Sequence, residues 1–147
     1  VLGRFSRAGW LDDGKGDRIA AKLVSDLDVK VADVDRPVQL LSGGNQQKVV
    51  LAKWMGTEPD IILMDEPTAG VDIGTKVEIV GMIRALADAG KGVVFISSEF
   101  PELLAVCDRV LVLRDGLVES SLERSQIADE DELHLAVQGY QRTTTNA

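Results

Sequence analysis

Hydrophobic residues in the first part of the chain are spaced as on one face of a helix. An amphipathic helix is predicted over residues 17–27, because apolar side chains recur there at intervals of three and four positions. These side chains are Ile19, Leu23, Val24 and Leu27. Residues 1–16 carry glycines and charges without such a period, so a loop is predicted there. Pro37 interrupts the run that follows and marks a connector.

Two further helices are predicted from start and stop residues. Ser42 and two glycines precede a helix expected over residues 45–55, and Gly56 and Pro59 end it. Residues 75–89 place apolar side chains on one broad stripe, which predicts a third helix ended by two nearby glycines. The stripe comprises Val77, Ile79, Val80, Ile83, Leu86 and Ala87.

Short apolar runs between these helices predict strands. Residues 61–66 (IILMDE) and 93–97 (VVFIS) show little polar alternation, so both strands are expected to be buried on both faces, as in a parallel sheet. A loop over residues 70–74 and a short helix over residues 103–106 follow these two strands in turn. Strands that alternate with helices in this way are typical of an α/β layered domain.

The last part of the chain predicts a hairpin and a helical end. Residues 109–113 and 117–120 flank the dipeptide Asp115-Gly116, which favours a tight antiparallel turn. Two short acidic helices and a polar tail at residues 141–147 are expected to follow.

Composition narrows the class of protein. A chain of 147 residues with 45% hydrophobic and 27% charged residues is ordinary for one soluble globular domain. No apolar run reaches the ~18 residues of a membrane-spanning helix. The net charge of −8 argues against a nucleic-acid-binding protein, which needs a basic face, and is simplest to explain by solubility. The single cysteine, Cys107, excludes an intramolecular disulfide and is expected to be a small buried hydrophobe.

The segment Ser42-Gly43-Gly44-Asn45-Gln46-Gln47 at a helix start is a candidate phosphate site. A helix start offers N–H groups and partial positive charge, glycines let an anion approach, and a serine hydroxyl adds a donor. The alternative is that these residues form only a helix cap and a turn.

A second candidate site is Asp65-Glu66, at the end of an apolar strand. The carboxyl edge of a sheet is where α/β proteins bind ligands. One carboxylate there suits Mg²⁺, and its neighbour suits the activation of an attacking water. The alternative is that the two acidic residues merely begin a loop or cap a helix.

Taken together, the segments LSGGNQQ (41–47), IILMDE (61–66), AGVD (69–72) and ISSE (96–99) resemble the ABC ATPase family. They are similar to its signature motif, its Walker B strand, its D-loop and the strand that follows. Details of these motifs are similar to the second cassette of bacterial monosaccharide importers of the ribose/galactose/xylose type. The resemblance covers residues 17–138.

The resemblance implies a role for each motif residue in binding ATP and Mg²⁺. Asp65 would position Mg²⁺, and Glu66 would be the general base. The signature residues would contact the γ-phosphate of ATP bound on an opposing cassette, since these motors work as head-to-tail pairs. These residues, with the interface residue of the D-loop, are Ser42, Gly43, Gly44, Gln46 and Asp72.

The resemblance also implies a fold and partners. The fold would be part of a P-loop NTPase (ABC ATPase) core, with a mostly parallel sheet, an antiparallel hairpin and a helical subdomain remnant. Residues 1–40 would be that remnant, 41–122 the core, and 123–147 a helical tail. The expected partners are a second cassette, transmembrane permease subunits and, indirectly, a periplasmic sugar-binding protein. No nucleic-acid partner is expected. The protein would lie at the cytoplasmic face of the inner membrane and energise sugar uptake.

Two departures from the family pattern bear on activity. The phosphate-binding loop G-x-x-x-x-G-K-[ST] is absent, since Gly14-Lys15-Gly16 does not fit it. Ser98 stands at a catalytic position where the family usually has a histidine, while the only histidine, His134, is expected at the surface.

These departures leave rival functions open. The rival is an ABC-like interaction or regulatory module that does not hydrolyse ATP. An ABC-type ATPase acting on DNA or ribosomes is disfavoured by the charge. The chain opens on an apolar pair without an initiator methionine, so it is expected to be part of a longer protein. By itself it is expected to bind ATP weakly and to form a homodimer through uncovered strand faces.

Overall fold

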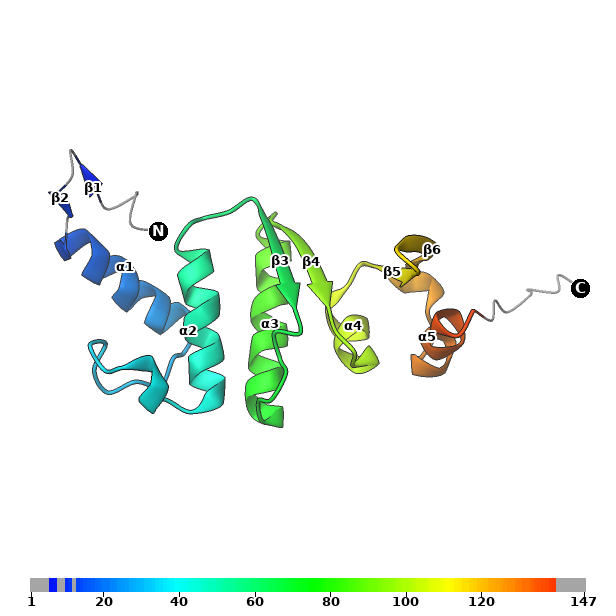
Figure 1. The fold of residues 1–147 in the computed structure, drawn as a ribbon, viewed down its shortest axis with the longest axis horizontal. Coiled ribbons are helices and arrows are strands. Elements are labelled where there is room, and N and C mark those ends of the chain that lie inside the picture. The colour runs from blue at the N-terminus through cyan, green and yellow to red at the C-terminus, as the bar shows by residue number, and fades with distance from the viewer. Residues whose placement is uncertain (1–5, 8–9, 12, 140–147) are drawn as a thin grey trace, which may run out of the picture. The chain divides into compact units, whose positions relative to one another are not determined.

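The computed structural model describes residues 6–7, 10–11 and 13–139 (Figure 1). Its elements in chain order are β1 (Ser6–Arg7), β2 (Trp10–Leu11), α1 (Asp13–Asp26), η2 (Val38–Leu40), α2 (Gly43–Met55), β3 (Ile61–Asp65), α3 (Ile73–Asp88), β4 (Gly92–Ile96), α4 (Phe100–Val106), β5 (Arg109–Arg114), β6 (Leu117–Glu123), η3 (Arg124–Gln126) and α5 (Glu130–Val137). The polar tail expected at 141–147 lies outside the described residues. None of the helices described is long and apolar enough to cross a membrane.

The chain divides into two compact units. The first comprises residues 1–63 and 67–94, and the second comprises residues 64–66 and 95–147. Each unit has a hydrophobic cluster of its own, so each is described separately.

The start of the first unit differs from the predicted loop. β1 and β2 pair antiparallel, and α1 begins at Asp13, four positions before the predicted start at Asp17. Glycine is tolerated in a first helical turn, where backbone N–H groups have no intrahelical partner in any case. The Arg18 Nε donates to the Gly14 carbonyl at 2.9 Å, which ties this early turn to the next one. The glycines therefore did not delay the helix as the sequence suggested.

The core of the first unit lies between α1, the segment that follows it, and α2. Leu27, Val29 and Ala52 are its buried centre, and partly buried apolar side chains surround them. These are Leu23, Val24, Val31, Val49, Met55 and Met82. The amphipathic pattern predicted for residues 17–27 is confirmed, since Leu23, Val24 and Leu27 all belong to this cluster.

A buried lysine links three elements of the first unit. Lys48 on α2 is only 2% exposed, and its Nζ lies 2.7 Å from a carboxylate oxygen of Glu78 on α3. The same ammonium donates to the Asp28 carbonyl after α1 at 2.9 Å. The hydrogen bond from Lys48, with its charge, holds the pKa of Glu78 below its ordinary value of 4.5. A buried ammonium is stable only when it is bonded in this way.

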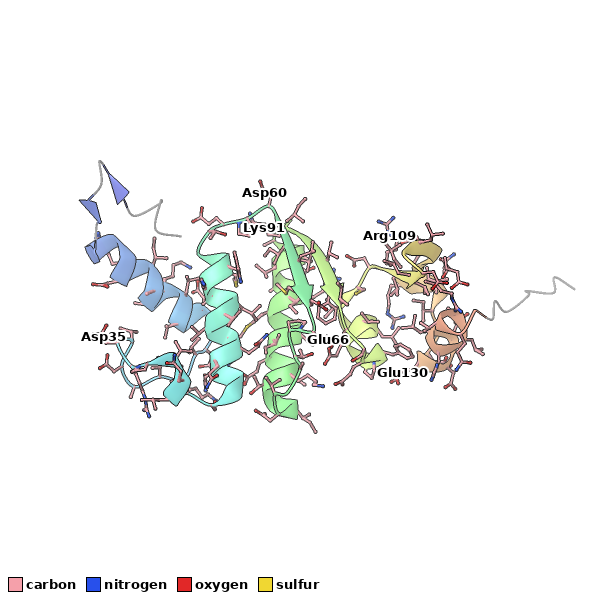
Figure 2. The ribbon with its side chains drawn as sticks, viewed as in Figure 1. Asp35, Asp60, Glu66, Lys91, Arg109 and Glu130 are labelled. Atoms are coloured by element: carbon pink, nitrogen blue, oxygen red, sulfur yellow. The ribbon has the colours of Figure 1, made fainter. Side chains whose placement is uncertain are left out.

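β3 and β4 pair in the parallel orientation that the sequence predicts. At the start of the pair the Gly92 N–H donates to the Asp60 carbonyl at 2.8 Å, and at its end the Glu66 N–H donates to the Ile96 carbonyl at 2.9 Å. Both arrows accordingly point the same way in Figure 1. Figure 2 shows Asp60 and Lys91 at the end where the strands begin and Glu66 where β3 stops.

The prediction that both strands are buried on both faces is wrong for this structure. Along β3, exposed and buried residues alternate: Ile62 and Met64 are buried, whereas Ile61 and Leu63 are 68% and 72% exposed. On β4, Val94 and Ile96 are about half exposed. Successive side chains of a strand point to opposite faces. Among the described residues one face of β3 is buried, and the covered face of β4 is only partly buried.

α3 begins and ends with well-formed caps. Its last turn closes as a Schellman motif, in which Lys91 N–H bonds Leu86 O and Gly90, at φ 86°, bonds Ala87 O. Ile79 and Ile83 are fully buried, as the stripe predicts. Val77 was assigned to the same stripe but is 66% exposed, because the covered face of the helix is narrower than the apolar one.

The second unit contains the predicted hairpin and a helical end. β5 and β6 pair antiparallel across Asp115-Gly116, whose φ angles of 51° and 78° are those of a tight turn with a right-handed strand twist. Of the two acidic helices expected after it, α5 is present. The other is the short 3₁₀ turn η3, which is not acidic but is closed by a reciprocal box between Glu123 and Gln126.

The core of the second unit joins the hairpin to α4 and α5. Val110, Ile127 and Leu133 are buried at its centre. The residues packed against them are Phe100, Leu103, Leu104, Cys107 and Leu122. Burial, and to a smaller extent Asp108, raises the pKa of the Cys107 thiol above its ordinary value of 9.0. The cysteine therefore acts as a packing residue, as expected, although it is only partly buried.

Candidate functional site

The residues predicted from the sequence to form the site fall into two groups. The first unit holds the signature residues and the D-loop aspartate: Ser42, Gly43, Gly44, Gln46 and Asp72. The second unit holds the candidate metal ligand, the candidate base and the residue at the histidine position: Asp65, Glu66 and Ser98.

Ser42 stands at the N-cap position of α2 without capping it through its side chain. Its backbone is extended, and its carbonyl accepts the Gln46 N–H at 2.9 Å, the first bond of the helix. The hydroxyl makes no capping bond to the helix and instead accepts from the Asn45 Nδ2 at 2.8 Å. Ser42 and Gly43 are both exposed. This helix start is therefore open to an anion, as the phosphate-site interpretation requires.

Gly44 is fixed by packing rather than by access for a ligand. A Cβ at this position would lie 2.5 Å from the Thr75 Cγ2 and 2.6 Å from its Oγ1, distances that no real side chain tolerates. At Gly43 the nearest atom to such a Cβ is the Gly70 carbonyl at 3.9 Å, an ordinary contact. Position 44 therefore requires glycine, because the missing side chain lets α2 and α3 pack closely, whereas position 43 has room for a Cβ.

Asp72 is linked to Gly44 through Thr75, which contacts both residues. Its side chain caps α3, accepting the Thr75 N–H at 3.0 Å and the Thr75 hydroxyl at 2.8 Å. These bonds, the backbone one first, hold the pKa of Asp72 below its ordinary value of 3.8. Thr75 therefore connects the D-loop aspartate with signature Gly44. Sequence reasoning missed this threonine, although Asp followed three positions later by Thr is a capping pattern.

Two amides shape the loop that leads to α2. The Asn45 Oδ1 accepts the Lys30 N–H at 2.7 Å, and the Gln46 Nε2 donates to the Leu41 carbonyl at 2.9 Å. Asn45 lies in the candidate phosphate segment without a role of its own in the prediction, yet its side chain bridges Lys30 and Ser42. The Gln46 side-chain amide is thus bonded to the backbone of the loop that precedes α2.

Glu66 is held in an unusual backbone conformation directly after β3. Its φ of 45° lies in the left-handed region, which costs a residue other than glycine about 1 kcal/mol. Its N–H donates to the Ile96 carbonyl, and its carboxylate accepts the Ser98 N–H at 2.7 Å. Backbone strain of this kind tends to occur at functional sites, where the surrounding structure holds it in place. The carboxylate is therefore fixed in direction.

Ser98 contributes its backbone to this arrangement, while its side chain is exposed. The preceding hydroxyl, Ser97 Oγ, donates to the Glu102 carboxylate at 2.7 Å and accepts the Glu99 N–H at 3.0 Å. Sequence reasoning did not select Ser97 or Glu102. The only available sign was a charged residue within an otherwise apolar short helix.

Asp65 ends β3 beside Glu66, and its side chain is exposed. Among the described residues no group of three or more histidine, cysteine or acidic side chains is arranged to hold a metal ion. Mg²⁺ commonly binds through one or two carboxylates and completes its shell with water and phosphate oxygens. One exposed aspartate at a strand end fits that mode of binding.

His134 does not belong to either group. It is exposed on α5, where its ring meets that of Phe100 edge-on with centroids 5.3 Å apart. Its interpretation as a surface residue is confirmed.

Comparisons with known proteins identify the family that this chain resembles. A family model described as ABC transporter matches residues 11–69. The chain is 50% identical over 135 residues to the ribose import ATP-binding protein RbsA of Rhodococcus jostii, covering 92% of this chain and 27% of that protein. It is 42% identical over 134 residues to the L-arabinose transport ATP-binding protein AraG of Geobacillus stearothermophilus, covering 91% and 26%. The chain thus spans about a quarter of the length of these relatives.

Solved structures show the same fold. A dimeric ATP-binding cassette in a post-hydrolysis state, bound to ADP and Pi, superposes with a TM-score of 0.70 at 26% identity, over 82% of this chain and 52% of that one. The predicted fold, part of a cassette with a parallel strand pair and an antiparallel hairpin, is confirmed. This chain belongs to the ABC transporter family and carries part of an ATP-binding domain.

Proposed function

We propose that the whole protein hydrolyses ATP to drive the import of a sugar. The observation that carries this proposal is the fixed direction of the Glu66 carboxylate at the carboxyl end of β3. A general base must be oriented toward the proton that it removes. The relatives that import ribose and transport L-arabinose support a monosaccharide as the cargo, without selecting one.

The chemistry assigned to the second unit is the activation of water. Glu66 accepts a proton from the water whose oxygen attacks the γ-phosphorus, while the bond from that phosphorus to the β–γ bridging oxygen breaks. Asp65 is the residue that would hold Mg²⁺, which when bound offsets negative charge on the phosphates. The Ser98 N–H keeps the Glu66 carboxylate in place and leaves its other oxygen available for the water.

The chemistry assigned to the first unit is recognition of phosphate held elsewhere. The open start of α2 offers the Ser42 hydroxyl and the first N–H groups of the helix to the γ-phosphate of ATP bound on a second cassette. Gln46 takes part only after its bond to the Leu41 carbonyl opens. Asp72, at the start of α3, lies at the interface between the two cassettes in this proposal.

The proposed partners follow from this division of roles. A second cassette in a head-to-tail pair supplies the phosphate-binding loop that faces the signature residues. Permease subunits meet the helical region at residues 1–40, a periplasmic sugar-binding protein acts through the permease, and the protein lies at the cytoplasmic face of the membrane. By itself this chain binds ATP weakly and pairs with a second copy through the exposed side of β3 and β4.

A second candidate function is a cassette that binds a partner without hydrolysing ATP. The observation that favours it is Ser98, because a serine cannot supply the imidazole that the family usually places there. Under this alternative only the signature residues matter, since they complete the site of the other cassette.

Two substitutions in the full-length protein distinguish the candidates. If Glu66 is the base, Glu66→Gln retains ATP binding and lowers this site's share of turnover about 10²- to 10⁴-fold. If the cassette is inactive, Glu66→Gln leaves the ATPase rate unchanged, whereas Ser42→Arg still abolishes it by placing a bulky cation at the start of α2. Normal turnover in Ser42→Arg would refute the role given to the signature residues. Ser121→Ala, on the exposed side of β6, is the control.

A further inference from the structure

We propose that Glu102 is a positioning residue for Glu66, acting through the Ser97 hydroxyl and the Ser98 backbone N–H. The inference rests on the proposed role of Glu66 as the base. It assigns a function to a buried acidic residue that the mechanism above does not use.

Glu102 is a buried carboxylate with a specific hydrogen-bond donor. It lies in the first turn of α4 and is only 4% exposed. The Ser97 hydroxyl donates to its Oε2 at 2.7 Å. Burying a carboxylate is costly unless it is bonded, and a hydrogen bond to an ionised group is short and strong. The Ser97 side chain therefore has one strongly preferred position.

The fixed Ser97 side chain in turn restrains the backbone that follows it. Its Oγ also accepts the Glu99 N–H at 3.0 Å, which closes a local turn over two residues. The peptide between Ser97 and Ser98 lies within that turn, so its N–H cannot rotate freely. This N–H is the one that donates to the Glu66 carboxylate at 2.7 Å.

Two hydrogen bonds hold Glu66 to the segment that contains Ser98. Its own N–H donates to the Ile96 carbonyl, and its carboxylate accepts from Ser98, so both attachments are to one short segment, residues 96–98. Displacement of that segment would move the carboxylate with it. The path therefore runs from α4 through Glu102, Ser97 and the Ser98 N–H to the base.

The arrangement makes no use of the Ser98 side chain, which is exposed. A backbone donor is present whatever the residue at position 98, except proline. Ser98→Ala is therefore expected to preserve the orientation of Glu66, and Ser98→Pro to abolish it. The cassette keeps a directed base although it lacks the imidazole.

Nuclear magnetic resonance of this chain tests the path without requiring ATP. In the unmodified chain, the Ser98 amide proton is expected to resonate downfield of its position in an unstructured peptide, because it donates to the Glu66 carboxylate, and Glu66→Ala should remove that downfield displacement. Ser97→Ala and Glu102→Ala should reduce the Glu66-dependent downfield displacement at least twofold. Ser97→Thr, which keeps a hydroxyl, should retain it, and so should the control Ser121→Ala.

The outcome is decisive even if one variant folds poorly. Well-dispersed amide resonances from β5 and β6 identify the variants that fold. If Glu102→Ala does not fold, Ser97→Ala still tests the path, because it removes a single oxygen atom. An unchanged Glu66-dependent downfield displacement of the Ser98 amide proton in folded Ser97→Ala would overturn the proposal.

Kinetics of the full-length protein separate this proposal from the proposed function. Ser97→Ala is expected to lower kcat for ATP hydrolysis about 10- to 100-fold with little change in KM, as for a misplaced catalytic group. If Glu66→Gln leaves the rate unchanged while the resonance results hold, the role of Glu66 as the base is wrong and the positioning path stands. If Glu66→Gln lowers the rate but Ser97→Ala does not, the positioning path is wrong.

Discussion

The two units hold their candidate site residues by different physical means. In the first unit, Asp72, Thr75 and Gly44 form a chain of side-chain bonds and close packing, in which Gly44 leaves no room for a Cβ beside Thr75. In the second unit, Glu66 is held mainly by backbone groups, through its own N–H and that of Ser98, at a φ of 45°.

The difference indicates which changes each group tolerates. Close packing is sensitive to the volume of side chains, because interiors are dense and yield little. Backbone attachment is sensitive to the path of the chain and indifferent to many side chains. The candidate phosphate site, which is built in the first way, and the candidate base, which is oriented in the second, are expected to fail under different substitutions.

The largest effects test whether the two cores are independent. Leu27, 2% exposed in the first unit, and Leu133, fully buried in the second, belong to separate clusters. Replacing either by alanine is expected to cost about 2–5 kcal/mol, from lost burial and the cavity that remains. Hydrogen exchange should show each substitution weakening protection mainly in its own unit. Equal loss of protection in both units would show that the cores act as one.

A smaller loss is expected at Gly44. Gly44→Ala forces Thr75 aside and is expected to destabilise the first unit by about 1–3 kcal/mol. Gly81→Ala is the matched control on α3, where nothing lies within 4 Å of the added Cβ, and it should stabilise by about 0.5–1 kcal/mol. Urea denaturation measures both. Partial recovery in Gly44→Ala with Thr75→Ala would confirm the contact, and a neutral Gly44→Ala would contradict it.

Two residues with the same strained φ sharpen the comparison further. Asp28 and Glu66 both have φ 45°. Asp28→Gly relieves the strain and keeps the carbonyl that Lys48 binds, so a gain of about 0.5–1 kcal/mol is expected. Glu66→Gly relieves the same strain but loses the bond from Ser98, so its thermal midpoint should stay nearly unchanged. A clear gain in Glu66→Gly would mean that the Ser98 bond contributes nothing to stability.

The smallest expected effect is on the pH dependence of stability, through Asp72. Because the pKa of Asp72 is lowered on folding, mainly by the Thr75 N–H, its ionised form stabilises the fold above its ordinary value of 3.8. That contribution is lost as the pH falls through the lower pKa of the folded chain. Asp72→Ala should therefore flatten the stability curve below about pH 4. Denaturation at a series of acid pH values measures the slope, and an identical slope would contradict the cap.

The sequence determined those elements whose cause is local. Helical spacing predicted the helices near residues 17–27 and 75–89, start and stop residues predicted the helix near 45–55, and the dipeptide Asp115-Gly116 predicted the hairpin turn. Each of these depends on residues within a few positions of one another. The motifs likewise gave the family, because their residue types and order are themselves local patterns.

Burial and contacts between distant residues were decided by the tertiary structure alone. The sequence predicted strands buried on both faces, but whether the second face of β3 is covered depends on what packs there, and Leu63 remains exposed. The crowding of Gly44 by Thr75 and the bond from Ser98 to Glu66, 32 positions apart, each join separate elements. Local patterns select an element because they act along the chain. The direction of the Glu66 carboxylate and the need for glycine at position 44 are set only when those elements meet in space.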